Sequence, residues 1–269
     1  MNEINKTLYI PLYGKSFVSK KGIILSDKRA EDIWSVAGFD LKRRSRSKWL
    51  AYYMGVRSAV FDEWTRQRME ELPSSVVIHI GCGLDSRAER VGCNGHLWYD
   101  IDFPEVIAER RKYFSESAEY KMIEGDAENP DWLSLIEASE SAVVLLEGVS
   151  MYLSFEKIKL LFSALSQKFG EVALLMDAYS VFAAKMSKFK NPINEVGVTS
   201  VYGIDEPDAL SGEGLEFLRE REMTPKKFID ELSGMERVVF EKLYAGATSK
   251  KLYKLYEYKK ENQNEEENN

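Results

Sequence analysis

An apolar run that leads directly into a Gly-x-Gly turn constrains the fold of this chain most strongly. Residues 76–80 are mostly β-branched and apolar, and Gly81, Cys82 and Gly83 follow at once. The run predicts a buried strand, and the glycines allow the backbone to approach a ligand closely. A second predicted strand, residues 97–102, ends in the carboxylate of Asp102. Together these features are typical of a nucleoside pocket, in which the acid accepts hydrogen bonds from the ribose hydroxyls.

The phosphate-binding fingerprint G-x-G-x-x-G is incomplete, because Ser86 stands where its third glycine would be. This departure favours a nucleoside ligand that lacks a pyrophosphate.

Composition bounds the class of protein. The chain has 269 residues, of which 44% are hydrophobic and 30% charged, and these values suit a globular protein with one large domain. Its net charge of −7 argues against general nucleic-acid binding, and no apolar run is long enough to span a membrane. Cys82 and Cys93 belong to no metal-ligand pattern, so we expect reduced thiols in a cytoplasmic protein without a metal. Of the two histidines, we expect His79 to pack in its strand and His96 to be exposed.

Strands and helices alternate from residue 76 onward, which predicts an α/β fold with a doubly wound, mostly parallel, Rossmann-like sheet. The expected strands are residues 76–80, 97–102, 120–124, 142–147, 171–177, 236–243 and 251–258. The expected helices are residues 30–36, 49–69, 86–91, 104–117, 130–139, 154–169 and 225–233, the last bracketed by Pro225 and Gly234.

The predicted organisation has three parts. Residues 1–72 form an N-terminal helical cap, and residues 73–258 form the ligand-binding domain. Within that domain, an insertion at residues 178–222 is expected beside the carboxyl ends of the strands, where it can act as a substrate lid. The polar tail, residues 259–269, is expected to be disordered.

Five segments together resemble the leucine carboxyl methyltransferase family, including its bacterial polyketide O-methyltransferase branch. They are GCGLDSR at 81–87, DFPEVI at 102–107, GDA at 125–127, EGVSMYL at 147–153 and, upstream, RSAVFD at 57–62. The resemblance covers roughly residues 25–180. It implies the seven-stranded sheet of the class I methyltransferases, whose last strand is antiparallel.

The resemblance also implies S-adenosylmethionine as the cofactor. The expected cofactor-binding residues are Arg57, Gly81, Cys82, Gly83, Asp102, Phe103, Asp126, Ala127, Glu147 and Gly148. Asp102 is expected to bind the ribose, and Asp126 and Ala127 the adenine. Glu147 is expected to balance the ammonium and sulfonium charges, while Arg57 pairs with the methionine carboxylate.

Each assignment has a structural alternative. Asp102 fits a role in capping the helix that Pro104 opens, Asp126 that of a turn residue, and Arg57 that of a surface ion-pair partner. Asp85 and Arg87 are expected to form a local ion pair that shapes the turn.

The methyl acceptor is less well defined. Tyr152, Tyr179 and Tyr202 are the candidate substrate-binding residues, and further apolar side chains of the insertion, at Phe182, Met186, Phe189 and Phe217, suit either an acceptor pocket or ordinary packing. No catalytic residue is assigned, because an ionised carboxylate acceptor needs no general base, whereas a phenol or alcohol would benefit from one. The absence of an evident base favours a carboxylate on a small molecule or a peptide terminus. The oligomeric state is left open.

Three alternatives stay open at this point. A nicotinamide-dependent oxidoreductase shares the glycine turn and the acid, a non-catalytic cofactor-binding protein would show the same motifs, and a protein carboxyl methyltransferase would differ only in its docking surface.

Overall fold

The computed structural model of the chain describes residues 7–36, 41, 45–187, 201–212 and 214–261. In chain order the helices and strands are α1 (Tyr9–Lys21), α2 (Lys28–Val36), α3 (Lys48–Glu71), β1 (Val76–Ile80), α4 (Arg87–Val91), β2 (Trp98–Asp102), α5 (Pro104–Arg110), β3 (Tyr120–Glu124), η2 (Pro130–Leu135), β4 (Ser141–Leu146), η3 (Ser150–Tyr152), α6 (Phe155–Lys168), β5 (Glu171–Tyr179), α7 (Val181–Met186), η5 (Pro207–Leu210), β6 (Glu216–Arg221), α8 (Lys226–Ile229), α9 (Gly234–Leu243), α10 (Ala247–Lys250) and β7 (Tyr253–Lys260).

The strands form one seven-stranded sheet in the order β3-β2-β1-β4-β5-β7-β6. Strands β3, β2, β1, β4 and β5 pair in parallel, whereas β7 is antiparallel to both of its neighbours. The expected doubly wound, mostly parallel sheet with an antiparallel last strand is confirmed. The chain order reverses between β1 and β4, and such a switch point opens a crevice at the carboxyl ends of the strands.

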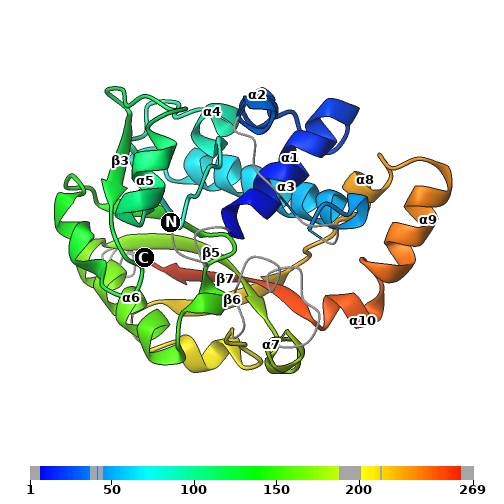
Figure 1. The fold of residues 1–269 in the computed structure, drawn as a ribbon. Helices are drawn as coiled ribbons and strands as arrows, with labels where there is room; N and C mark the ends of the chain where they lie inside the picture. Colours follow the sequence, from blue (N-terminus) through cyan, green and yellow to red (C-terminus); the bar gives the residue numbers. More distant parts are fainter. Residues whose placement is uncertain (1–6, 37–40, 42–44, 188–200, 213, 262–269) are drawn as a thin grey trace.

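Successive residues of the central strands point to opposite faces of the sheet and enter two separate cores. Val77 of β1 packs in the core that includes Trp64 of α3, whereas Ile78 packs in the core that includes Phe162 of α6. The N-terminal helices and α6 therefore cover opposite faces, as Figure 1 shows. Both faces of β1 are buried, and this explains its continuous apolar sequence.

Helices predicted at 30–36 and 49–69 correspond to α2 and α3, whereas α1 lies within the predicted helical cap but was not predicted as a helix of its own. This helix buries Gly14, Lys15 and Ser16 alongside its apolar residues, so it lacks a clean apolar stripe. A Cβ on Gly14 would lie 2.6 Å from the Cβ of Met54, and the close approach of α1 to α3 therefore requires glycine there.

The C-terminal part corrects three predictions. Residues 236–243, predicted as a strand, form most of α9, and the predicted helix at 225–233 is reduced to α8. Gly234 begins α9 instead of ending a helix. The run Val238–Phe240 has strand-forming composition, but Phe240 packs edge-on against Tyr52 of α3, with 6.2 Å between ring centroids, so tertiary packing overrides local propensity.

The sixth strand, β6, lies inside the range 178–222 that was predicted as an insertion. Its sequence EFLRER is highly charged because β6 is an edge strand whose side chains are mostly exposed. Strand β7 runs to Lys260, so the predicted tail cannot begin at residue 259, and residues 262–269 lie outside the described residues. The helices predicted at 104–117 and 130–139 end early, at Arg110 and, as a 3-10 helix, at Leu135.

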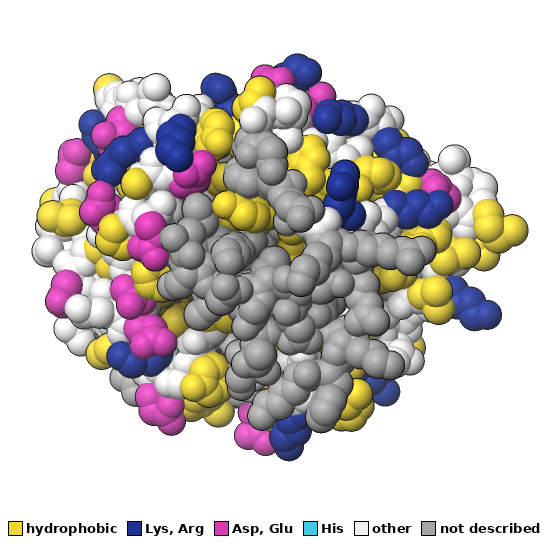
Figure 2. All heavy atoms as spheres, viewed as in Figure 1, with side chains coloured by type: hydrophobic (Ala, Val, Ile, Leu, Met, Phe, Trp, Pro, Cys, Tyr) yellow, Lys and Arg dark blue, Asp and Glu magenta, His cyan; other side chains and the backbone are white. Residues whose placement is uncertain are grey.

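His96 is buried, contrary to the prediction, because its Nδ1 lies 2.8 Å from the backbone oxygen of Ser75. His79 is buried in β1 as expected. On the face viewed in Figure 2, acidic side chains gather on the side of β3 and α6, and basic side chains are more frequent on the side of α1 and α8. No helix in the described parts of the chain is both long and apolar enough to cross a membrane.

Candidate active site

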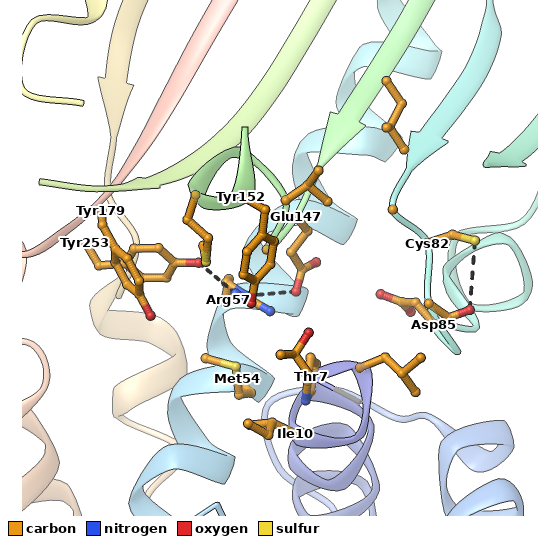
Figure 3. A pocket seen from close by; sticks show the side chains of 18 of the residues that line it. Thr7, Ile10, Met54, Arg57, Cys82, Asp85, Glu147, Tyr152, Tyr179 and Tyr253 are labelled. Carbon is orange, nitrogen blue, oxygen red and sulfur yellow. Dashed lines mark hydrogen bonds and ion pairs between the residues drawn. The ribbon is translucent and has the colours of Figure 1, made fainter. Parts of the chain in front are cut away.

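A cavity of about 1090 Å³ opens at the carboxyl ends of the parallel strands. Residues that follow β1, β2 and β4 line it, and side chains of α1 and α3 cover it from the N-terminal part of the chain. Small-molecule pockets typically enclose roughly 300–1,000 Å³, so the cavity has room for a nucleoside cofactor and a second small molecule. Figure 3 shows the part of the cavity where α1, α3 and the strand ends meet.

The glycine turn requires glycine at two positions. Gly81 and Gly83 have φ angles of 68° and 53°, in the left-handed region that side chains disfavour. The N–H of Gly81 donates to the Ile101 carbonyl at 2.7 Å, and a Cβ on Gly81 would overlap the Val149 side chain. The turn thus lies close against β2 and the end of β4, and Gly81, Cys82 and Gly83 all line the cavity.

Asp102 connects the glycine turn to the end of β2. Its Oδ2 accepts from the N–H of Gly83 and its Oδ1 from the N–H of Phe103, both at 2.8 Å. The capping alternative is wrong, since Phe103 and not Asp102 is the N-cap of α5, and the two N–H groups that donate to Asp102, those of Gly83 and Phe103, lie outside the helix. Burial raises the pKa of Asp102 to about 6, against the opposing effect of the two backbone donors. Asp102 and Phe103 both line the cavity.

Asp126 both shapes a turn and lines the cavity. Its Oδ1 accepts from the N–H of Glu128 at 2.8 Å, so the turn alternative describes part of its role. The same residue and Ala127 are part of the cavity wall beside Asp102. The structure therefore brings the ends of β1, β2 and β3 together around one end of the cavity.

Arg57 lies at the centre of a buried ionic cluster. Its Nε donates to Oε1 of Glu147 at 2.9 Å, and its Nη1 donates to Oδ2 of Asp177 at 3.0 Å and to the Tyr253 hydroxyl at 2.8 Å. Only 5% of Arg57 is exposed, so the surface ion-pair alternative is wrong. Arg57, Glu147 and Gly148 line the cavity, and in Figure 3 Arg57 points between Glu147 and the tyrosine rings.

The cluster extends behind Glu147. Arg87 donates to Oε2 of Glu147, and the Oε1 atom also accepts from Ser58 at 2.9 Å. Burial alone would raise the pKa of Glu147, but Arg87 and Arg57 outweigh it and lower the pKa to about 2. The expected pair of Asp85 and Arg87 is present at 3.4 Å.

The structure adds Lys15, which the sequence did not single out. Its Nζ lies 2.9 Å from Oδ2 of Asp85, and both residues line the cavity although Lys15 is only 2% exposed. A buried lysine needs a partner of opposite charge, and Asp85 provides it. Nothing in the local sequence of α1 distinguishes Lys15 from a surface lysine, so only the tertiary structure identifies it.

The candidate acceptor residues separate into two groups. Tyr152, Tyr179, Phe182 and Met186 line the cavity. Tyr202 does not: its side chain is 55% exposed and lies outside the cavity wall. Phe217 packs in the sheet against the tyrosines of β7, and Phe189 lies outside the described residues.

Residues 3–166, more than half of the chain, match the sequence profile of the family described as leucine carboxyl methyltransferase. The chain belongs to this family. It is therefore a methyltransferase that uses S-adenosylmethionine as its cofactor.

Two curated relatives agree with this membership. The chain is 26% identical over 240 residues to the tetracenomycin polyketide synthesis O-methyltransferase TcmP of Streptomyces glaucescens, covering 88% of this chain and 89% of the relative. It is 26% identical over 228 residues to the S-adenosyl-L-methionine-dependent methyltransferase dpfgK of Gibberella zeae, covering 76% of each.

Among solved structures, the magnesium protoporphyrin IX methyltransferase ChlM of Synechocystis PCC 6803 with bound SAH superposes with a TM-score of 0.51. It is 15% identical, and the match covers 95% of this chain and 99% of that one. At this identity the likeness concerns the fold, and it supports the Rossmann-like methyltransferase sheet. The matches give no support to a nicotinamide-dependent oxidoreductase.

The five segments that suggested the resemblance to the leucine carboxyl methyltransferase family lie around one cavity in this chain. Each contributes at least one residue to the cavity wall, from Arg57 on α3 to Glu147 after β4. Segments separated by up to 90 positions thus meet in one site.

Proposed function

We propose that this protein transfers a methyl group from S-adenosylmethionine to an oxygen of a small molecule. One observation carries the proposal: the glycine turn, the carboxylate of Asp102 and the Arg57–Glu147 pair all face a single cavity that continues between tyrosine rings. The relative from Streptomyces glaucescens is named for polyketide synthesis, which supports a small-molecule acceptor. The reduced cysteines are consistent with the predicted cytoplasmic location, which stays a prediction.

The nucleoside half of the cofactor fits the ends of β1, β2 and β3. The positive φ angles of Gly81 and Gly83 keep side chains out of the turn, so its backbone can approach the ligand. Asp102 is buried and its pKa is raised, so hydroxyl donors from a ribose would stabilise its ionised form. We assign Phe103 to the wall beside the ribose, and Asp126 with Ala127 to the adenine.

The methionine half fits the cluster around Arg57. Its two ion pairs and its bond to Tyr253 use Nε and Nη1, so Nη2 carries the donors that we assign to the methionine carboxylate. Lys15 supplies a second cation on the same side of the cavity. Glu147 and Gly148 line the wall here, and we assign Glu147 two roles: it holds Arg57 in place and supplies negative charge toward the cationic end of the cofactor.

When bound, the cofactor supplies a methyl group that is already activated on a sulfonium. The protein must therefore mainly align the acceptor with this methyl group and exclude water. We assign the acceptor to the space beside Tyr152 and Tyr179, which lies next to Arg57. The acceptor atom is an oxygen of either a carboxylate or a hydroxyl.

Calorimetry with S-adenosylhomocysteine and with NAD tests the proposed cofactor site. We expect the nucleoside to bind with a Kd in the micromolar range, about −8 kcal/mol, and NAD to give no measurable heat. Transfer of a labelled methyl group from S-adenosylmethionine into a metabolite extract then tests for catalysis. Tight binding of NAD, or no binding of S-adenosylhomocysteine at millimolar concentration, would overturn the proposal.

A further inference from the structure

The hydroxyl of Tyr253 lies at the point where the ionic cluster meets the acceptor end of the cavity. Tyr253 belongs to β7, and the two residues that its hydroxyl contacts, Asp177 and Arg57, belong to β5 and α3. Tyr253 donates to Oδ2 of Asp177 and accepts from Nη1 of Arg57 at 2.8 Å. Tyr253 lines the cavity, while Asp177 behind it is fully buried. Figure 3 shows the ring of Tyr253 beside that of Tyr179, with Arg57 close by.

The direction of these hydrogen bonds determines what Tyr253 can offer to a ligand. A guanidinium only donates, so the Tyr253 oxygen must accept from Arg57, and an ionised carboxylate only accepts, so the single phenolic proton goes to Asp177. What remains on the Tyr253 oxygen is a lone pair. Toward the cavity, Tyr253 is therefore a hydrogen-bond acceptor, which suits a ligand that carries an O–H.

The charge of the cavity wall points the same way. Its described side chains include five carboxyl groups, one lysine, one arginine and one histidine, which are Asp85, Asp102, Asp126, Glu128 and Glu147 on one side and Lys15, Arg57 and His79 on the other. Arg57 is paired with Glu147 and Asp177 and its Nη2 is assigned to the methionine carboxylate, while Lys15 is paired with Asp85. An anionic acceptor would meet the lone pair of Tyr253 without an unassigned Lys or Arg side chain of this wall to pair with, whereas a neutral hydroxyl can donate a hydrogen bond to that lone pair.

The surroundings of Tyr253 are aromatic. Its ring centroid lies 4.8 Å from that of Tyr179 and 6.1 Å from that of Tyr53, and Phe182 and Leu252 belong to the same wall. Flat rings at these separations pack well against another aromatic ring. The acceptor end of the cavity thus combines aromatic walls with one oriented proton acceptor.

We propose that the methyl acceptor is an aromatic hydroxyl compound, a phenol, and that Tyr253 receives its proton and passes its own proton to Asp177. This inference rests on the proposed methyltransferase function and replaces the carboxylate acceptor that the sequence favoured. In the step, the acceptor oxygen forms its bond to the methyl carbon while the carbon–sulfur bond breaks and its electron pair stays on sulfur. The phenolic proton moves to the Tyr253 oxygen as the proton of Tyr253 moves to Oδ2 of Asp177.

The groups around Asp177 suit this transfer. Burial raises the pKa of Asp177 and outweighs the opposing effects of Arg57 and Tyr253, and the nearby charge of Glu147 raises it further. Burial also holds the pKa of Tyr253 well above its usual value of 10.0, so the residue rests as a neutral phenol. The N–H of Gly148 donates to Oδ1 of Asp177 at 2.7 Å and holds the carboxylate in place. After the transfer, Arg57 is still paired with Glu147.

Two probes that share one ring system test the acceptor class. 2-Naphthol and 2-naphthoate are titrated by calorimetry into the protein saturated with S-adenosylhomocysteine at neutral pH. We expect 2-naphthol to bind at least about tenfold more tightly, because only it can donate to Tyr253. Equal or tighter binding of 2-naphthoate overturns the proposal, as does the failure of 2-naphthol to bind at about 1 mM.

Two variants test the proton path. Tyr253→Phe removes the acceptor oxygen, so we expect 2-naphthol to bind at least about fivefold more weakly while S-adenosylhomocysteine still binds, because Arg57 keeps Glu147 and Asp177.

Asp177→Asn cannot take up the proton, so we expect kcat for labelled methyl transfer to 2-naphthol to fall by about 100-fold with little change in KM. The rate of the parent should decline at acid pH, where Asp177 becomes protonated, and the rate of the variant should not show this decline. Tyr256→Phe is the matched control, because Tyr256 lies on the same strand and donates to the Ile204 carbonyl outside the cavity.

The outcomes separate this inference from the proposed function. If the parent protein does not bind S-adenosylhomocysteine, the proposed function fails. If it binds the cofactor product but Tyr253→Phe binds 2-naphthol as the parent does, or Asp177→Asn keeps the parent pH profile, only the inference about Tyr253 and Asp177 fails.

Discussion

Arg57 and Glu147 form a buried ion pair, with 2.9 Å between Nε and Oε1, that joins α3 to the residue directly after β4. The two residues are 90 positions apart in the sequence. Arg87 donates to the second carboxylate oxygen of Glu147 and holds this side chain in place. Glu147 in turn fixes the direction of the Arg57 guanidinium. A cation held in this way needs little reorganisation when a ligand carboxylate arrives.

Replacement of Arg57 by lysine should weaken cofactor binding. A lysine has one ammonium instead of a planar fork, so it cannot hold Glu147, Asp177 and a ligand carboxylate at once. We expect S-adenosylhomocysteine affinity to fall by roughly 1–3 kcal/mol, as measured by calorimetry. We also expect the free energy of unfolding to fall by about 3 kcal/mol or more in urea titrations, because buried carboxylates lose their partner.

Arg29→Lys provides the control for this change. Arg29 pairs with Glu89 on the surface, where both side chains are more than two-fifths exposed. Such a pair contributes only about 0–1 kcal/mol, so neither cofactor affinity nor stability should change appreciably. Parent-like affinity in Arg57→Lys would remove Arg57 from the cofactor site.

Replacement of Asp102 by asparagine tests the ribose assignment. The amide keeps the size of the side chain but loses the charge and one acceptor oxygen, so we expect cofactor affinity to fall by roughly 1–3 kcal/mol. Glu124→Gln is a close control, since Glu124 is the register partner of Asp102 on β3 yet is exposed and lies outside the cavity wall. Equal affinities of the two variants in calorimetry would show that Asp102 does not bind the nucleoside.

Cofactor affinity should also depend on pH through Asp102. Burial raises the pKa of this carboxyl group to about 6 in the free protein, and ribose hydroxyls can donate only to its ionised form with full strength. Binding is therefore expected to be strongest above pH 6 and to weaken by up to about tenfold per unit as the pH falls below 6. The Kd of S-adenosylhomocysteine measured between pH 5 and 8 checks this. Asp102→Asn should lack this dependence, and a parent curve that is flat over the same range contradicts the assignment.

The sequence predicts those parts of the site that depend on local pattern. An apolar strand, a glycine turn and a terminal acid identify Asp102, because the geometry of a strand–turn–strand unit is contained in a short segment. Lys15, Asp177 and Tyr253 carry no such local signal. They become part of the site only when α1, β5 and β7 come together beside the cavity, and the charge balance that buries Lys15 against Asp85 exists only in the tertiary structure.

The same reasoning explains the errors in the C-terminal part. The edge strand β6 gains its stability from backbone pairing with β7, so its charged side chains give no strand signal. The residues of α9 have the composition of a strand, but Phe240 is buried by packing against Tyr52 of α3, which lies far away in the sequence. Both contacts join residues that are far apart in the sequence, so local propensity cannot predict either of them.

Replacement of Gly81 by alanine should damage both the fold and the cofactor site. Gly81 has a φ angle of 68°, and an added Cβ would overlap Val149 at the end of β4. Gly95→Ala is the matched control, because Gly95 also has a positive φ, of 88°, but a Cβ there would meet open space. We expect Gly95→Ala to lower the free energy of unfolding by about 1–2 kcal/mol from backbone strain alone and to leave cofactor affinity unchanged.

The free energy of unfolding of Gly81→Ala should be lower than that of Gly95→Ala by at least about 1 kcal/mol, since the turn must move away from Val149. For the same reason Gly81→Ala should bind S-adenosylhomocysteine at least about tenfold more weakly than the parent. Urea unfolding and calorimetry on the two variants measure both quantities, and equal stability together with equal affinity would mean that the glycine turn tolerates a side chain and does not set the approach to the ligand.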